Sequence, residues 1–237
     1  MEFPKTLIKR NGYIERIKPF MRKNIAKVLT GQRRVGKSFL LYQLMDQLLA
    51  EDPDANIIYI NFEDFAFSHI QTAEDMHAYI MSKFRKEKYN YIFVDEIQEI
   101  VNFERVIRSL LLNENNDIYI TGSNAKMLSG ELATYLSGRY IEFSVYSLSY
   151  LEFLAFHKLE NNNESLYLYS RYGGLPYLIN LPLKDETVNE YLKSVYSTIV
   201  FRDVVSRYNL RNSSFLEKLV QFLSENIGNL FSAKNIS

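Results

Sequence analysis

The chain of 237 residues contains no cysteine and only three histidines. The lack of cysteine excludes a disulfide framework, a cysteine-ligated zinc site, an iron–sulfur cluster and thiol chemistry. The histidines, at positions 69, 77 and 157, are too scattered to predict a histidine-rich metal site. The sequence also lacks the apolar core of a signal peptide and any uninterrupted apolar run of about 18 residues. We therefore expect a cytoplasmic protein that spans no membrane.

The chain has no net charge, but its charges are unevenly distributed. Residues 1–37 contain eleven lysines and arginines and only two acids, so this opening carries +9 and the rest of the chain −9. Such a basic opening favours an anionic partner, either a nucleotide phosphate or nucleic acid. The alternative is a solvated helix face beside a phosphate site. Apolar residues make up 47% of the chain, which excludes wholesale disorder, and the length predicts one large domain with a smaller one.

Short apolar runs alternate with helical patterns through the first two thirds of the chain. We expect strands at 24–30, 57–62, 91–94, 118–121 and 140–145, and helices at 38–50, 73–85, 103–112 and 126–137. This alternation predicts an α/β fold in which a parallel five-stranded sheet has helices on both faces. Ligands bind such sheets at the carboxyl ends of the strands, so we expect the functional residues there.

The segment Gly31–Ser38, which has the sequence GQRRVGKS, fits the phosphate-binding loop (P-loop) pattern G-x-x-x-x-G-K-[ST]. Its glycines let backbone N–H groups close around phosphates, and the following helix directs its positive end at the same place. Lys37 is expected to reach the β- and γ-phosphates, and the Ser38 hydroxyl to ligate Mg²⁺. The alternative is a glycine loop with a surface lysine. The residues expected around the nucleotide are Gly31, Gln32, Arg33, Arg34, Val35, Gly36, Lys37, Ser38 and Phe39.

Two acids, Asp95 and Glu96, follow the apolar run 91–94, and Asp95 stands 58 residues after Lys37 of the P-loop. Neighbouring strand residues point to opposite faces, so the two carboxylates can have different roles. We expect Asp95 to hold Mg²⁺ through its water shell and Glu96 to orient and polarise an attacking water. The alternative is an ordinary strand end, because strands often end in acids.

The next strand ends in polar residues, Ser123 and Asn124. Either side chain is expected to reach the γ-phosphate or the water beside Glu96. The alternative is a simple turn, since Gly-Ser-Asn is favourable turn chemistry.

These three motifs in this order, with Arg139 shortly before the fifth strand, resemble the AAA+ superfamily of P-loop ATPases. The chain is similar in particular to predicted bacterial and archaeal ATPases of a STAND-like group, whose loop reads G-x-R-R-x-G-K-[ST]. The resemblance covers most of the chain. It implies that Ser123 or Asn124 is a sensor residue and that Arg139 acts on the γ-phosphate, within its own subunit or from a neighbour. The alternative for Arg139 is a surface ion pair.

The resemblance also implies contacts to the base of the nucleotide. Pro176, in the element Gly173-Gly174-Leu175-Pro176, matches a proline that lies near the adenine in signalling-type relatives. Arg10 and Tyr13 lie upstream of the loop, where members of the superfamily pack N-terminal residues against the base.

By this resemblance the chain consists of an ATPase core at 1–147, a helical lid at 148–205 and the start of a winged helix at 206–237. We expect this winged helix to continue into a longer protein with a nuclease-like domain. The expected function is Mg²⁺-dependent hydrolysis of ATP to ADP, coupled to lid motion. The alternatives are a slow nucleotide-dependent switch and a DNA-binding module that uses the basic opening and the winged helix. Assembly into a homo-oligomer is also expected.

Overall fold

The computed structural model describes residues 7–123, 136, 138–199 and 213–228. The chain forms two compact units, Met1–Asn180 and Leu181–Ser237. The second unit contains α9 (Asp185–Thr198) and α11 (Ser213–Glu225). The boundaries at 147 and 205 and the winged helix stay predictions, and most of the helix expected at 126–137 lies outside the described residues. None of the described helices is long and apolar enough to cross a membrane.

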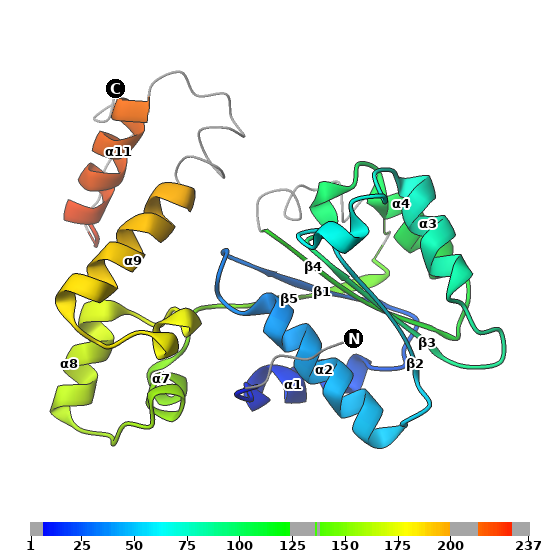
Figure 1. Cartoon of the computed structure of the whole chain (residues 1–237), viewed down its shortest axis with the longest axis horizontal. Coiled ribbons are helices and arrows are strands. Elements are labelled where there is room, and N and C mark those ends of the chain that lie inside the picture. The colour runs from blue at the N-terminus through cyan, green and yellow to red at the C-terminus, as the bar shows by residue number, and fades with distance from the viewer. Residues whose placement is uncertain (1–6, 124–135, 137, 200–212, 229–237) are drawn as a thin grey trace. The chain divides into compact units, whose positions relative to one another are not determined.

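Five parallel strands form one sheet in the order β2-β3-β4-β1-β5 (Figure 1). Each lies within two residues of its expected bounds, so the predicted α/β fold with a parallel five-stranded sheet is confirmed. Because β1 lies between β4 and β5, the loop after β1 emerges beside the ends of both. The strands are β1 (Ala26–Gly31), β2 (Asn56–Asn61), β3 (Asn90–Asp95), β4 (Asn116–Ser123) and β5 (Tyr140–Ser144).

Helices cover both faces of the sheet (Figure 1). On one face α1 (Asn11–Ile17) and α2 (Lys37–Glu51) share a buried apolar cluster with Leu29, Phe93 and Tyr119. On the other face α3 (Ala73–Ser82) and α4 (Phe103–Leu110) pack on Val28, Val94 and Ile120. Successive strand residues thus serve opposite faces, which explains why the strands are almost continuously apolar.

A buried ion pair joins the amino-terminal halves of β1 and β4. Lys27 and Asp117 are both fully buried and paired with each other. The Asp117 carboxylate also accepts hydrogen bonds from the Arg22 backbone N–H at 2.8 Å and from the Tyr119 hydroxyl at 2.7 Å. The Lys27 ammonium donates to the Ile25 carbonyl at 2.8 Å. Burial lowers the pKa of Lys27, and the charge of Asp117 opposes that shift.

After β5 the chain forms two helices, α7 (Tyr150–His157) and α8 (Asn163–Tyr172), and then returns to the P-loop. The Leu148 backbone N–H donates to the Gly174 carbonyl at 2.7 Å. A Cβ at Gly174 would stand 2.3 Å from the Leu148 carbonyl oxygen, so only glycine allows this approach. The contact places Pro176, two residues after Gly174, beside Gly36 of the P-loop.

Candidate functional site

The P-loop depends on two glycines in unusual conformations. Gly31 ends β1 at φ 151°, and a Cβ there would stand 2.2 Å from the Val145 carbonyl oxygen. Gly36 has φ 96° and precedes α2, with no side chain capping the first N–H groups of that helix. The loop therefore leads into the uncapped, positive end of a 15-residue helix, which is the arrangement that binds phosphate.

Lys37 and Glu96 lie together at this end of the sheet, as expected. The Lys37 ammonium donates to the carbonyls of Gly31 and Gln32, both at 3.1 Å, and lies 3.7 Å from Glu96 Oε1. Burial lowers the pKa of Lys37, and the Glu96 carboxylate opposes that shift. Gln98 donates a further hydrogen bond to Glu96 Oε2. Glu96 has a left-handed backbone conformation, φ 53°, directly after the end of β3.

Asp95 is almost fully buried beside the first turn of α2. Burial raises the pKa of its carboxyl group, and hydrogen bonds from Ser38 and Thr121 oppose that shift. Ser38 and Asp95, the two residues expected to hold Mg²⁺, are thus in direct contact. The Thr121 hydroxyl donates to Asp95 Oδ1 and accepts from the Glu96 backbone N–H at 3.0 Å, so one side chain positions both acids.

The sequence analysis missed Thr121, Gln98 and Tyr59. The Tyr59 hydroxyl donates to Asp95 Oδ2 at 3.5 Å and lies 3.1 Å from the Tyr42 hydroxyl. Burial and the charge of Asp95 raise the pKa of Tyr59, which keeps its hydroxyl protonated as a donor. Thr121 lies on β4 two residues before Ser123, but its role depends on how β4 lies beside β3. Tyr59 has no local signal, since its contact depends on the pairing of β2 with β3.

The remaining residues expected to be catalytic are Ser123, Asn124 and Arg139, and they do not all lie near the P-loop. Ser123 ends β4 directly opposite Gly31, at the level of the P-loop, and Asn124 lies outside the described residues. Arg139 is exposed, and its carbonyl accepts from the Ala26 N–H at 3.0 Å, at the amino end of β1. The P-loop begins at the other end of β1, about 17 Å away at the usual rise per strand residue. Arg139 is therefore remote from the P-loop of its own chain.

The residues expected to contact the nucleotide differ in their burial and in the groups they contact. Arg33 forms an ion pair with Glu63 at 3.1 Å, and Val35 is buried in the apolar cluster under α2. Gln32, Arg34 and Phe39 are exposed. Pro176 Cγ would lie 3.8 Å from a Cβ on Gly36, so the expected adenine contact stands next to the loop.

Arg10 and Tyr13 contact each other, with the guanidinium 4.6 Å from the centre of the tyrosine ring. Arg10 is almost completely buried, and the Tyr13 hydroxyl accepts from the Tyr146 N–H at 2.9 Å. Contact of Arg10, Tyr13 and Pro176 with a base stays a prediction.

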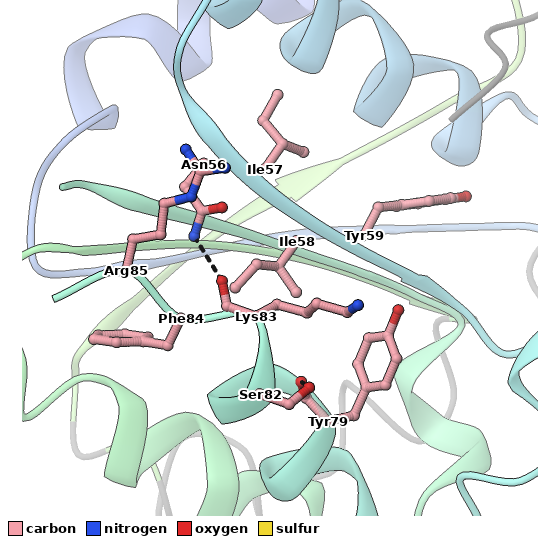
Figure 2. Close-up of a pocket in the computed structure, with 9 residues that line it drawn as sticks. All are labelled: Asn56, Ile57, Ile58, Tyr59, Tyr79, Ser82, Lys83, Phe84 and Arg85. Carbon is pink, nitrogen blue, oxygen red and sulfur yellow. Dashed lines mark hydrogen bonds between the residues drawn. The ribbon is translucent and has the colours of Figure 1, made fainter.

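A cavity of about 490 Å³ lies along the exposed edge of β2, and Tyr59 is among the residues that line it (Figure 2). The Asn56 side chain donates to the Lys83 carbonyl at 3.0 Å and so holds the end of α3 against the strand. The Lys83 side chain extends beside the strand toward Tyr79, with its ammonium 5.9 Å from the ring centre. Lys83 is the C-cap residue of α3, so the end of this helix and a charged side chain lie over the edge strand, an arrangement that discourages pairing with another chain.

Among the described residues, no group of three or more His, Asp or Glu side chains forms a metal cage. Mg²⁺ does not need one, because it commonly keeps several waters and takes one or two protein ligands together with phosphate oxygens. The contact between Ser38 and Asp95 fits that type of site.

A sequence profile described as AAA domain matches residues 23–154, which is more than half of the chain. The chain belongs to the AAA domain family. The matched segment contains the P-loop, both acids, β4 and Arg139. The expected likeness to AAA+ P-loop ATPases is confirmed at this level, and the narrower STAND-like assignment stays a prediction.

One bacterial and one archaeal protein are similar in sequence to most of this AAA domain chain. An uncharacterized protein of Haemophilus influenzae is 36% identical over 240 residues, which cover 98% of this chain and 59% of that protein. An uncharacterized protein of Methanocaldococcus jannaschii is 31% identical over 90% of this chain and 49% of its own length. The chain thus spans about half of each relative. In the Saccharomyces cerevisiae Hsp104:casein complex, one chain matches the fold with a TM-score of 0.51 at 14% identity, over 84% of this chain and 39% of that one.

Proposed function

We propose that this AAA domain binds ATP together with Mg²⁺ and hydrolyses it. The observation that carries the proposal is the meeting of Lys37, Asp95 and Glu96 at the carboxyl end of the sheet. The P-loop supplies backbone N–H groups and a helix end for the phosphates, and the two acids stand directly beside it. A binding site for phosphate alone needs no buried acids at that position, because they repel the ligand.

Each residue has a distinct role in this proposal. Lys37 neutralises charge on the β- and γ-phosphates, with its ammonium already directed across the loop by two carbonyls. Ser38 and Asp95 hold Mg²⁺, which supplies further charge neutralisation when bound. Thr121 fixes Asp95 and the backbone of Glu96 in one arrangement. Ser123, at the end of β4, or Asn124 senses the γ-phosphate.

Glu96 is the proposed general base. Its carboxylate lies 3.7 Å from the Lys37 ammonium, and this lysine marks the place of the γ-phosphate. In that position Glu96 can accept a proton from a water that attacks the γ-phosphate in line with the leaving ADP.

Arg139 acts, in this proposal, on the nucleotide of a neighbouring copy. Its exposed side chain begins at the amino end of β5, whereas its own P-loop is at the carboxyl end of β1. Hydrolysis then requires a homo-oligomer in which each copy supplies Arg139 to the next. Mixing Glu96→Gln chains with Arg139→Ala chains tests this, because a mixed assembly contains some sites with both residues intact.

Single-turnover hydrolysis of radiolabelled ATP with Mg²⁺ tests the proposed activity. We expect Glu96→Gln to bind ATP but to slow the chemical step by roughly 10²–10⁴-fold, as expected for loss of a general base. Glu99→Gln, an exposed acid three residues further on, is the matched control and should hydrolyse at the wild-type rate. Failure of the wild type to bind ATP would overturn the proposal.

A slow nucleotide-dependent switch is the second candidate. It is favoured by the hydrogen bond and the ion pair that hold the Glu96 carboxylate, because a base so engaged is less available to water. Tight ATP binding with equally negligible turnover in wild type and Glu96→Gln, at concentrations where copies assemble, would establish this function instead. Lid motion remains a proposal, as does DNA binding through residues 1–37 and the expected winged helix. A mobility shift on duplex DNA at low salt tests the DNA binding.

A further inference from the structure

Arg10 uses every hydrogen-bond donor of its guanidinium within the protein. Nε donates to Glu152 Oε1 at 2.8 Å, and Nη2 donates to Glu152 Oε2 at 3.0 Å and to the Ser147 carbonyl at 3.4 Å. Nη1 donates to the carbonyls of Val35 and Tyr146, both at 3.0 Å. A guanidinium has five N–H groups, so none is left over. The side chain is 3% exposed, and such burial is tolerated for a charge only when it is fully paired.

These contacts join parts of the chain that are far apart in sequence. Val35 belongs to the P-loop and directly precedes Gly36. Tyr146 and Ser147 form the connection from β5, and Glu152 is in the first turn of α7, 142 residues from Arg10. The Arg10 backbone N–H donates to Gln43 Oε1 at 2.9 Å, which anchors it on α2. The P-loop and α7 are therefore connected through one rigid, planar group.

We propose that Arg10 is a positioning residue that couples nucleotide at the P-loop to the attachment of α7. This inference rests on the proposed function, since it assumes that the loop binds nucleotide. Phosphate binding orders the loop and with it the Val35 carbonyl, which shares Nη1 of Arg10 with the Tyr146 carbonyl. The same guanidinium holds Glu152 in a two-pronged pair, the most geometrically restrictive type of ion pair. By reciprocity, firm attachment of α7 raises the affinity of the loop for nucleotide.

The coupling requires the shape of arginine as well as its charge. Lysine carries its donors on one nitrogen, so it cannot bridge the Val35 carbonyl and both oxygens of Glu152. Although burial opposes ionisation of Glu152, hydrogen bonds from Arg10 and the Ser149 N–H lower its pKa and keep the carboxylate charged. Arg10→Lys therefore removes the fork and keeps the charge. Glu152→Gln removes the charge and keeps an oxygen that accepts from the Ser149 N–H.

The test combines nucleotide affinity with hydrogen exchange on the full chain. A fluorescent mant-ADP titration with Mg²⁺ gives the affinity, and deuterium uptake of residues 150–157 with and without ADP reports the attachment of α7. We expect ADP to slow exchange of this helix in the wild type. In Arg10→Lys and Glu152→Gln we expect about tenfold weaker mant-ADP binding and no ADP-dependent protection of α7, even with saturating ADP.

Two control variants separate coupling from general destabilisation. Arg16→Lys changes an exposed arginine of α1 and should match the wild type in both measurements. Ser149→Ala removes the other side-chain partner of Glu152 and lowers helix stability, but it should retain ADP-dependent protection. A thermal melt sets a temperature at which each variant is folded. If Arg10→Lys does not fold, Glu152→Gln carries the test alone.

The outcomes distinguish this inference from the function on which it rests. Wild-type binding of mant-ADP with unchanged exchange in α7 would overturn the coupling and leave the proposed function intact. ADP-dependent protection of α7 that persists in Arg10→Lys and Glu152→Gln would also overturn the coupling and leave the proposed function intact. Arg10 would then have a purely structural role. Absence of mant-ADP binding by the wild type would overturn both proposals.

Discussion

The buried pair Lys27–Asp117 allows a quantitative prediction about the stability of the sheet. Lys27→Met keeps a similar length and volume but removes the ammonium, which leaves Asp117 with two donors and no countercharge. Breaking a fully buried pair by removing one partner costs about 3–5 kcal/mol. For a chain of this size each kcal/mol lowers the melting temperature by roughly 2–4 °C. The variant should therefore melt about 6–20 °C below the wild type.

The second partner and the double variant decide whether the pair itself is responsible. Asp117→Asn leaves the Lys27 ammonium buried without a carboxylate and should cost a similar amount. In the double variant Lys27→Met with Asp117→Asn no charge is buried, and the amide oxygen can still accept from Tyr119. The double variant should thus be more stable than the sum of the single losses predicts, by up to about 3 kcal/mol.

An exposed pair in the same chain is the matched control for this measurement. Lys88 and Asp54 are 3.6 Å apart with side chains 42% and 88% exposed. Lys88→Met should change the free energy of unfolding by less than about 1 kcal/mol, because surface pairs are screened by water. Urea unfolding and calorimetry on the full chain measure all four variants. The reasoning would be refuted if Lys27→Met and Asp117→Asn each cost as little stability as Lys88→Met. It would also be refuted if the double variant lost the exact sum of the two single losses.

Two further predictions concern the loop and Asp95. Gly31→Ala should destabilise the sheet and weaken mant-ADP binding, because the added Cβ would overlap the Val145 carbonyl. Gly12→Ala in α1 has open space around the added Cβ and should stabilise the fold by about 0.5–1 kcal/mol. Melts and titrations of the two variants check this contrast, and equal effects would contradict it. Because burial raises the pKa of Asp95, the nucleotide-free fold binds more protons than the unfolded chain between the ordinary and the raised pKa. The free energy of unfolding should therefore fall as the pH rises from the ordinary pKa of a carboxyl group to the raised pKa of Asp95, while the affinity for Mg²⁺ should rise. Asp95→Asn should remove the pH dependence of both quantities. Melts and Mg²⁺ titrations across a pH series measure them, and unchanged slopes in Asp95→Asn would count against the assignment.

Much of the fold was predictable because its signals are local. A strand buried on both faces needs several consecutive apolar residues, so segments such as 118–121 identify themselves in the sequence. Their ends were less predictable: β4 extends two residues further at each end, where Asn116 and Ser123 complete the pairing with neighbouring strands. Polar residues at strand ends pair through the backbone, which the side-chain pattern does not reveal.

The candidate site also has one part that the sequence predicted and another that only the structure shows. The P-loop is made of consecutive residues whose backbone N–H groups are proposed to bind phosphate, so its pattern can be recognised without a structure. Asp95 and Glu96 were also found, because they directly follow a buried strand. Thr121 was not recognised as the residue that positions both acids, since its contacts depend on how β4 lies beside β3.

The sequence by itself therefore determined the parallel sheet, the phosphate loop and the acidic pair, because each is specified by residues that are adjacent along the chain. Only the tertiary structure decided that Arg10 joins the P-loop to α7 and that Thr121 positions both acids. Both facts depend on which strands and helices lie side by side. That arrangement results from the packing of all helices and strands together, and no local stretch of sequence encodes it.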